Sequence, residues 1–204
     1  MTPRNDYYND ILLQEIASCQ RNFDQTQQIP TEIELELDEW VGKAPQQCGE
    51  LNYNIIKIKD HECSLNLSKI CSATEEYEEN TIYQPQLNGY ITYVWTIPDE
   101  SWFTTRNLEY DKSEHKFHAG FASGLVAMKA TSLGLKTGFT RCGPWTDSMW
   151  NQFLHTYNLN GEKHSKFCFA LGVGYPVKDK PYYWQEDLGN HEHLKPDFPE
   201  IDIL

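Results

Sequence analysis

One run of residues, 118–135, constrains the fold more than any other stretch of this chain. It reads HAGFASGLVAMKATSLGL, an apolar and helix-like pattern that contains glycines. Gly120 and Gly124 fall inside the helical pattern, where a glycine costs about 1 kcal/mol relative to alanine. With Ser123 and Ala127 they recur at spacings of three and four, which puts four small residues on one helical face. Such a face lets another backbone approach closely, either within one subunit or between two copies of the chain.

Length and composition are those of one globular domain. A chain of 204 residues, 39% of them hydrophobic, can bury a substantial core. We expect a single domain over residues 1–204, with an irregular arm at 177–204, where prolines are frequent and periodicity is weak. No apolar run is long enough for a membrane span. The first residues lack the pattern of a secretory signal, so we expect a cytoplasmic protein with six reduced cysteines.

The charge of the chain limits its partners. The formal net charge is −13 at pH 7, and a general nucleic-acid binder needs a positive surface. A small ligand that carries a phosphate is still compatible with this charge, because it needs only a local cationic pocket.

Hydrophobic periodicity predicts helices and strands intermixed along the chain. In residues 31–45, Thr31 and Glu34 have the spacing of a capping box at a helix start, and Pro45 would end that helix. This order predicts an α+β fold or a mixed α/β layer. The remaining pattern predicts helices at 7–20, 64–79, 118–135 and 147–157, strands at 53–58, 89–97 and 166–176, and loops at 98–114 and 136–146.

Several short motifs together resemble one enzyme family. The run AGFASGLVAMKATSLGLKTGF is followed about 30 residues later by ALGVGYP, and the pair resembles the C-terminal half of the nitroreductase family of flavoenzymes. Residues 11–58 are similar to that family's opening helix, Arg-x-Phe turn, second helix, Ala-Pro turn and strand. The resemblance covers roughly residues 7–176 in the family's order.

This resemblance implies an α+β fold with a mixed central β-sheet flanked by helices. It also implies an intertwined homodimer with FMN bound between the subunits. It places the glycine-bearing helix near the twofold axis, where two copies approach each other, and it places the loop KTGFTRCG beside the flavin ring. Arg21 matches the arginine whose charge favours the anionic reduced flavin, and residues 45–47 match the turn lent by the partner subunit. The implied cofactor-binding residues are Arg21, Pro45, Gln46, Gln47, Phe139, Thr140, Arg141, Cys142, Gly143 and Lys178.

The sequence departs from the family where the flavin phosphate is bound. Basic residues and a serine commonly precede the Arg-x-Phe turn in the family, whereas this chain has Ala17, Ser18 and Cys19. A phosphate dianion needs charge-assisted donors. The resemblance and the charge pattern leave Lys178, Lys180, Lys195 and Arg141 as alternative donors.

The resemblance implies an FMN-dependent oxidoreductase that takes electrons from NADH or NADPH and passes them to a small flat acceptor such as a nitroaromatic or a quinone. A flavin carries this chemistry itself, so no catalytic side chain is expected. The alternative is a binding or scaffold dimer that keeps the fold and has lost catalysis, which the altered phosphate region would favour.

Two other kinds of site are not favoured. The motifs HEC (61–63) and HEH (191–193) lack a second ligand cluster at zinc-like spacing, so no metal is expected. Cys142 with His118 or His155 could form a thiol nucleophile, but no signature of such enzymes surrounds Cys142.

Overall fold

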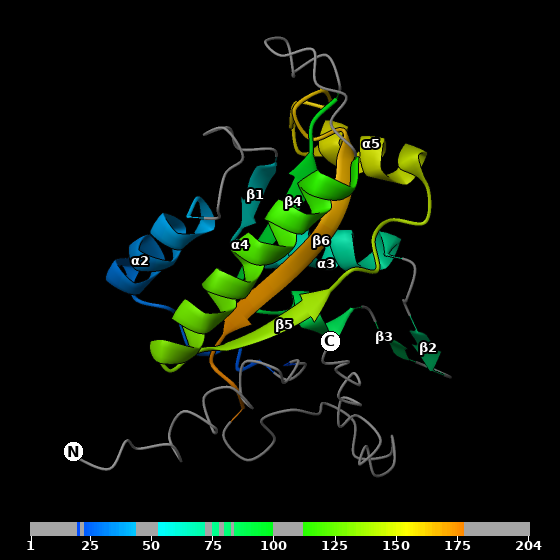
Figure 1. Ribbon diagram of the computed structural model, residues 1–204. Helices are drawn as coiled ribbons and strands as arrows, with labels where there is room; N and C mark the ends of the chain where they lie inside the picture. The colour runs from blue at the N-terminus through cyan, green and yellow to red at the C-terminus, as the bar shows by residue number, and fades with distance from the viewer. Residues whose placement is uncertain are drawn as a thin grey trace, which may run out of the picture.

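The computed structural model describes residues 20, 23–43, 53–71, 75–77, 80–82, 84–99 and 112–177. Helices and strands alternate irregularly along these residues (Figure 1). The helices are α2 (Thr31–Val41), α3 (His61–Ile70), α4 (Lys112–Ser132) and α5 (Asp147–Thr156), with a short 3-10 helix, η2, at Pro85–Leu87. The strands are β1 (Asn54–Ile58), β2 (Glu75–Tyr77), β3 (Asn80–Ile82), β4 (Ile91–Ile97), β5 (Lys136–Thr140) and β6 (Lys166–Gly174).

The described strands form a four-stranded sheet in the order β1-β4-β6-β5 and a small β2-β3 hairpin. Every described pair is antiparallel, including β4 with β6 and β5 with β6. The α+β class is confirmed, but the expected mixed sheet differs from the four strands observed. The reason is topological: α4 returns the chain so that β4 and β5 run in the same direction, and β6 then inserts antiparallel between them.

Helices cover both faces of this sheet (Figure 1). Alternate β4 residues supply the two cores because successive side chains of a strand point to opposite faces. Tyr93 and Trp95 pack on the face covered by α2 and α4. Val94 packs on the other face, under α3 and α5. Figure 1 shows α4 crossing in front of the sheet and α3 lying behind it.

The starts of three helices differ from the sequence expectation. α4 begins at Lys112 and not at 118, and the other two are α2 and α3. α2 begins at Thr31, but its N-cap is Pro30, with no side-chain cap. The expected capping box is therefore wrong, because the extended backbone of the proline already sets the helix start. α3 begins at His61 and not at 64, because the Asp60 carboxylate accepts a hydrogen bond of 2.7 Å from the Cys63 N–H. It ends at Ile70, and part of the expected 64–79 helix is instead the β2-β3 hairpin.

The expected loop at 136–146 is also wrong in its first half, which forms β5. β5 is an edge strand of the described sheet and pairs with β6 from Lys136 opposite Gly174 to Thr140 opposite Ala170. The strands at 53–58, 89–97 and 166–176 and the helix at 147–157 are confirmed within two residues of their ends. The helix expected at 7–20 lies outside the described residues except for Gln20, and the arm at 177–204 does so except for Val177.

Within the part of the chain that the structure describes, no helix has both the length and the apolar character that a membrane crossing requires.

Candidate functional site

The residues that follow the edge strand β5 form the candidate site. Five of the ten expected cofactor residues, those from Phe139 to Gly143, are described and lie consecutively at the end of β5. Phe139 exposes 42% of its side chain and Arg141 is also exposed. The structure thus presents an apolar ring and a cation two residues apart on an accessible edge. The other five expected residues, Arg21, Pro45, Gln46, Gln47 and Lys178, lie outside the described residues.

Thr140 holds this loop in place from within. Its side chain is buried, and its hydroxyl donates to the Gln84 side-chain oxygen over 3.1 Å. The same hydroxyl oxygen accepts a hydrogen bond from the Cys142 N–H over 3.2 Å. The Thr140 hydroxyl therefore serves the loop conformation and is not directed at a ligand.

The end of the loop is fastened to α3. Pro144 forms an isolated antiparallel bridge with Cys71, and the Trp145 N–H donates to the Ile70 carbonyl oxygen over 3.0 Å. Gly143 lies against the ring of Phe167, and a Cβ there would be 3.0 Å from Phe167 Cε1 and still closer to its Cδ1. A side chain at position 143 would push the loop away from the sheet, which explains the glycine.

The start of β5 is held beside two chain segments that flank undescribed site residues. The backbone N–H of Gln20 donates to the Thr137 carbonyl oxygen over 2.8 Å. A short bridge joins Phe23 to Pro176, just beyond the end of β6. Gln20 and Phe23 flank position 21 in the sequence, and Pro176 is two residues before position 178. Gln20, Phe23 and Pro176 therefore lie at the end of the sheet opposite the loop at 141–143.

Gly138 allows one of these close approaches. A Cβ at Gly138 would lie 2.9 Å from the Gln86 Cα and closer still to the Gln20 carbonyl oxygen. A real Cβ essentially never comes so near to backbone atoms, so a residue with a side chain would displace one of the segments that pack on β5.

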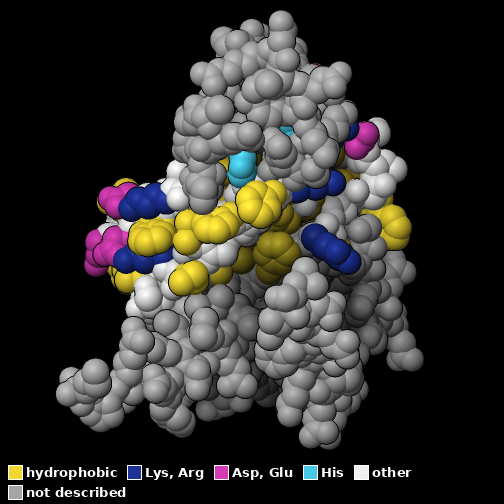
Figure 2. Space-filling view, in the orientation of Figure 1, with side chains coloured by type: hydrophobic (Ala, Val, Ile, Leu, Met, Phe, Trp, Pro, Cys, Tyr) yellow, Lys and Arg dark blue, Asp and Glu magenta, His cyan; other side chains and the backbone are white. Residues whose placement is uncertain are grey.

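An exposed apolar stripe runs along α4 on the outer side of the molecule. Phe117, Phe121 and Met128 expose 66%, 44% and 49% of their surface. They recur at intervals of four and seven residues, which places them on one helical face. Figure 2 shows this stripe as a yellow band over α4. Gly120 and Gly124 lie on the same face, and no described atom would come within 4 Å of a Cβ at either glycine.

The small residues of α4 therefore divide between two faces. Ser123 and Ala127 are buried against the protein's own core, with exposures of 4% and 8%. Gly120 and Gly124 face outward and contact no other part of the described chain. The interpretation of these glycines as packing positions within one subunit is wrong for the described residues, and the approach of a second copy stays a prediction.

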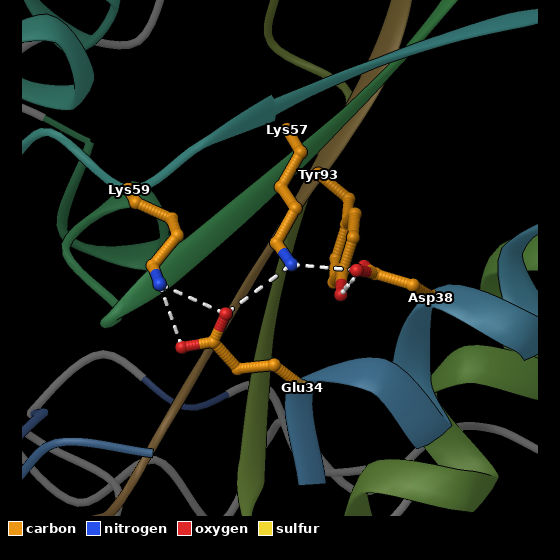
Figure 3. Close-up of polar contacts among 5 residues, drawn as sticks. All are labelled: Glu34, Asp38, Lys57, Lys59 and Tyr93. Atoms are coloured by element: carbon orange, nitrogen blue, oxygen red, sulfur yellow. Dashed lines mark hydrogen bonds and ion pairs between the residues drawn. The ribbon is translucent and has the colours of Figure 1, made fainter. Parts of the chain in front are cut away.

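A network of charges joins α2 to β1 and β4, away from this stripe (Figure 3). The Glu34 side chain is buried. Its carboxylate lies 2.8 Å from the Lys59 ammonium and 3.4 Å from the Lys57 ammonium. Lys57 also lies 2.7 Å from Asp38, and the Tyr93 hydroxyl donates to Asp38 over 2.7 Å. Burial, followed by the Asp38 contact, raises the pKa of Tyr93 far above its usual value. These groups satisfy one another, so the network ties the elements together.

Three of the described cysteines have thiols that are unsuited to nucleophilic catalysis, and the described residues contain no metal-binding cluster. No group of three or more His, Cys, Asp or Glu side chains among them could hold a metal ion. Burial raises the pKa of the Cys63 and Cys168 thiols to about 11 and that of Cys71 to about 12. Thiols with such pKa values are protonated at neutral pH and are poor nucleophiles. His191 and His193 lie outside the described residues.

Comparison of the sequence with known proteins gives no match. No protein-family model matches this chain, and no curated protein sequence does. The similarity of this chain to known proteins is therefore one of three-dimensional structure.

The fold is similar to that of solved nitroreductases. A nitroreductase family protein from Clostridium novyi NT superposes with a TM-score of 0.62 at 14% identity, over 85% of this chain and 87% of that one. An FMN-dependent nitroreductase from Clostridium difficile R20291 gives 0.59 at 16% identity, over 90% and 95% of the two chains. A Desulfovibrio desulfuricans structure named as a nitroreductase in complex with FMN gives 0.60 at 15% identity, over 92% and 98%. The chain has a nitroreductase-like fold, which confirms the resemblance seen in its motifs.

Proposed function

We propose that this nitroreductase-like fold binds FMN and works as an oxidoreductase, which passes electrons from NADH or NADPH to a small flat acceptor such as a quinone or a nitroaromatic. The observation that carries the proposal is the loop at 139–143, which ends an edge strand with an exposed aromatic ring and an exposed arginine. The names of two similar solved structures mention FMN, one as an FMN-dependent nitroreductase and one as a nitroreductase in complex with FMN.

The residues of this loop fit a flat anionic cofactor. Phe139 offers an apolar surface, and the exposed Arg141 offers a cation beside it. Gly138 and Gly143 keep the loop close to the sheet, so that no side chain at either position projects over this edge. Bound FMN would supply hydride and electron transfer, while Phe139 would orient the ring and Arg141 would counter negative charge.

The phosphate of FMN would be held at the other end of β5. The segments that flank Arg21 and Lys178 are both fastened there, through Gln20 to Thr137 and through Phe23 to Pro176. Two cations from separate segments would compensate for the absence of basic residues at Ala17–Cys19. The turn at Pro45–Gln47 would come from the partner subunit.

The proposal is tested by titrating the purified protein with FMN and measuring the visible spectrum and the tryptophan fluorescence. We expect micromolar affinity and FMN-dependent oxidation of NADH or NADPH. An absence of FMN binding at micromolar concentration would refute the proposal. Arg141→Ala should weaken FMN binding, whereas Lys163→Ala, a lysine in the turn before β6, should leave it unchanged.

A second candidate is a binding or scaffold dimer that has lost catalysis. The replacement of the basic phosphate cradle by Ala17, Ser18 and Cys19 favours it. The two functions diverge on turnover. FMN binding without oxidation of NADH or NADPH supports the scaffold, and rapid turnover with a quinone excludes it.

A homodimer completes this proposal. We infer that a second copy of the chain covers the α4 stripe of Phe117, Phe121 and Met128, because the outward glycines leave room for another backbone. A leucine at Gly124 would separate the two backbones and cost about 1–3 kcal/mol at each symmetric contact. Leucine also favours the helix more than glycine does, so a loss of assembly would not reflect a loss of α4.

The assembly is measured by size-exclusion chromatography with light scattering. We expect a dimer for the unmodified protein and for Gly161→Leu, and a shift toward monomer, with loss of FMN, for Gly124→Leu. Gly161 is a matched control because a Cβ there also has no described atom within 4 Å. Lys129 is unsuitable as a control, since its ammonium forms an ion pair of 2.5 Å with Glu36 on α2. A monomeric unmodified protein contradicts the interface.

A further inference from the structure

Cys71 and Cys142 lie on two segments joined by a backbone bridge, the end of α3 and the loop after β5. Cys71, the residue after α3, pairs with Pro144 across an antiparallel bridge. Cys142 is two residues before Pro144, and alternate residues of an extended segment point to the same side. In the register of this bridge, Cys142 is the diagonal neighbour of Cys71, a position from which the side chains of paired segments can interact.

The electrostatics of the two thiols agree with this placement. The pKa of Cys71 is raised first by burial and then by the negative charge of the Cys142 thiolate. Such an effect requires the two sulfur atoms to lie within range of a Coulomb interaction.

The two thiols differ in accessibility. Cys71 is fully buried in the core beneath α3 and α5. Cys142 is half-buried, on a loop whose Cys142 N–H is held by the 3.2 Å hydrogen bond to Thr140. A reagent in solution therefore reaches Cys142 first, and Cys71 can react only with a group that Cys142 brings to it.

We propose that Cys71 and Cys142 form a reversible disulfide that fastens the loop at 139–143 to the end of α3. The bond requires Cα atoms about 4.4–6.8 Å apart, whereas diagonal partners of two extended segments lie about 7–8 Å apart. The loop must therefore move toward Cys71 when the disulfide forms. A disulfide that holds its loop under such tension is easily reduced, which suits a thiol pair in a reducing compartment.

The chemistry proceeds by two exchanges with a small disulfide such as oxidised glutathione. The Cys142 thiolate attacks one glutathione sulfur, a mixed disulfide forms, and the other glutathione leaves as a thiolate. Cys71 then gives up its proton and attacks the Cys142 sulfur, which expels the second glutathione. Two protein thiols are oxidised and one small disulfide is reduced, and the two protons end on the two glutathione thiols. The high pKa of Cys71 makes the second step the slow one.

The test maps disulfides without any cofactor. The reduced protein is incubated with oxidised glutathione, its remaining thiols are alkylated, and its peptides are identified by mass spectrometry. We expect one linked pair of peptides that joins Cys71 to Cys142, with the loss of two of the six thiols of the chain. Persistence of Cys142 as a stable glutathione adduct, or of both residues as free thiols in excess disulfide, would overturn the proposal.

Variants separate the first attack, by Cys142, from the second attack, by Cys71. Cys142→Ser should leave Cys71 reduced, and Cys71→Ser should stop at the glutathione adduct of Cys142. Cys168→Ser is the matched control and should still form the link, because Cys168 lies on the opposite face of the sheet from Cys71. If the buried Cys71→Ser substitution prevents folding, the Cys142→Ser arm decides, since reaction of Cys71 with glutathione in that variant contradicts the proposed order.

The consequence for FMN rests on the proposed function. Because the disulfide shifts the loop that carries Phe139 and Arg141, we expect the oxidised protein to bind FMN about fivefold or more weakly than the reduced protein. An equal affinity of the two forms overturns this consequence. A linked protein without FMN affinity in either form refutes the proposed function and leaves the thiol pair intact. A protein that binds FMN but never forms the disulfide refutes the thiol-pair proposal and leaves the proposed function intact.

Discussion

His164 makes the stability of this protein sensitive to moderate acid. The imidazole is 5% exposed and lies just before β6, with Nδ1 2.7 Å from the Thr96 hydroxyl. That hydroxyl also donates to the Asn54 carbonyl oxygen over 3.2 Å. A hydroxyl has one proton, so when it bonds to Asn54 it must accept from His164, which sets the neutral tautomer with the proton on Nδ1.

The magnitude follows from the pKa of His164. Burial, followed by the charge of Lys163, lowers this pKa from 6.5 to about 4. Between pH 6.5 and pH 4 the unfolded chain binds a proton that the folded protein does not. The contribution of His164 to the free energy of unfolding is therefore fully present above pH 6.5 and is lost as the pH is lowered. A shift of that size corresponds to about 3 kcal/mol when the pH is below both values, and to about 2 kcal/mol at pH 5.

The assay is urea denaturation followed by tryptophan fluorescence at pH 8, 6 and 5. His164→Asn is the comparison, because its amide can still donate to Thr96 and does not titrate. We expect the free energy of unfolding of the unmodified protein to fall by about 2 kcal/mol more than that of the variant between pH 8 and pH 5. Equal losses in the two proteins would show that His164 is not the group responsible.

Two further substitutions test the packing and the helix caps. Gly172→Ala should lower the free energy of unfolding by about 3 kcal/mol, because its Cβ would overlap the Gln86 carbonyl group. Urea denaturation should show no such loss for Gly161→Ala. An equal loss in the two variants would refute the packing argument. Asp60→Ala should cost about 1 kcal/mol in the same assay because it removes the cap of the Cys63 N–H, and Asp60→Asn, which keeps an acceptor, should recover most of that loss if the cap is responsible.

Much of the fold could be predicted from the sequence where local pattern and tertiary packing agree. The β4 run of Ile91–Ile97 consists of β-branched and aromatic residues, and all seven are buried in a central strand. The helix at 147–157 was expected from its apolar spacing, and its three buried residues lie on one face. The order of the motifs was enough to indicate the nitroreductase-like fold, although no single motif was specific.

The errors have a common physical origin in contacts that the local pattern does not contain. The sequence predicts a loop at 136–146, whereas residues 136–140 form β5. A glycine in a strand often marks a close backbone approach, and Gly138 is required by the nearby Gln20 and Gln86 backbone. The described strand pairs are all antiparallel where a mixed sheet was expected, because nothing in the sequence indicates that β6, the last described strand, enters between β4 and β5.

The candidate site could be predicted only in part. The loop at 139–143 was identified from its resemblance, but the role of Thr140 in holding it depends on Gln84, which is more than 50 residues away in the sequence. The proximity of Cys71 and Cys142 has the same origin, since it follows from the bridge to Pro144. Cys142 belongs to the KTGFTRCG loop but Cys71 belongs to no motif, so the sequence alone offers no signal for the pair.

The position of β6 has a consequence for how the chain is made. β6 pairs with β4 on one side and β5 on the other, and it is the last described strand to leave the ribosome. Until then, β4 and β5 each lack a neighbour, and unpaired strand edges invite association with other chains. Contacts between residues so far apart in sequence also form slowly. Nascent chains that end before Lys166 should therefore be the species most dependent on chaperones, and release of β6 should be the step that completes the sheet.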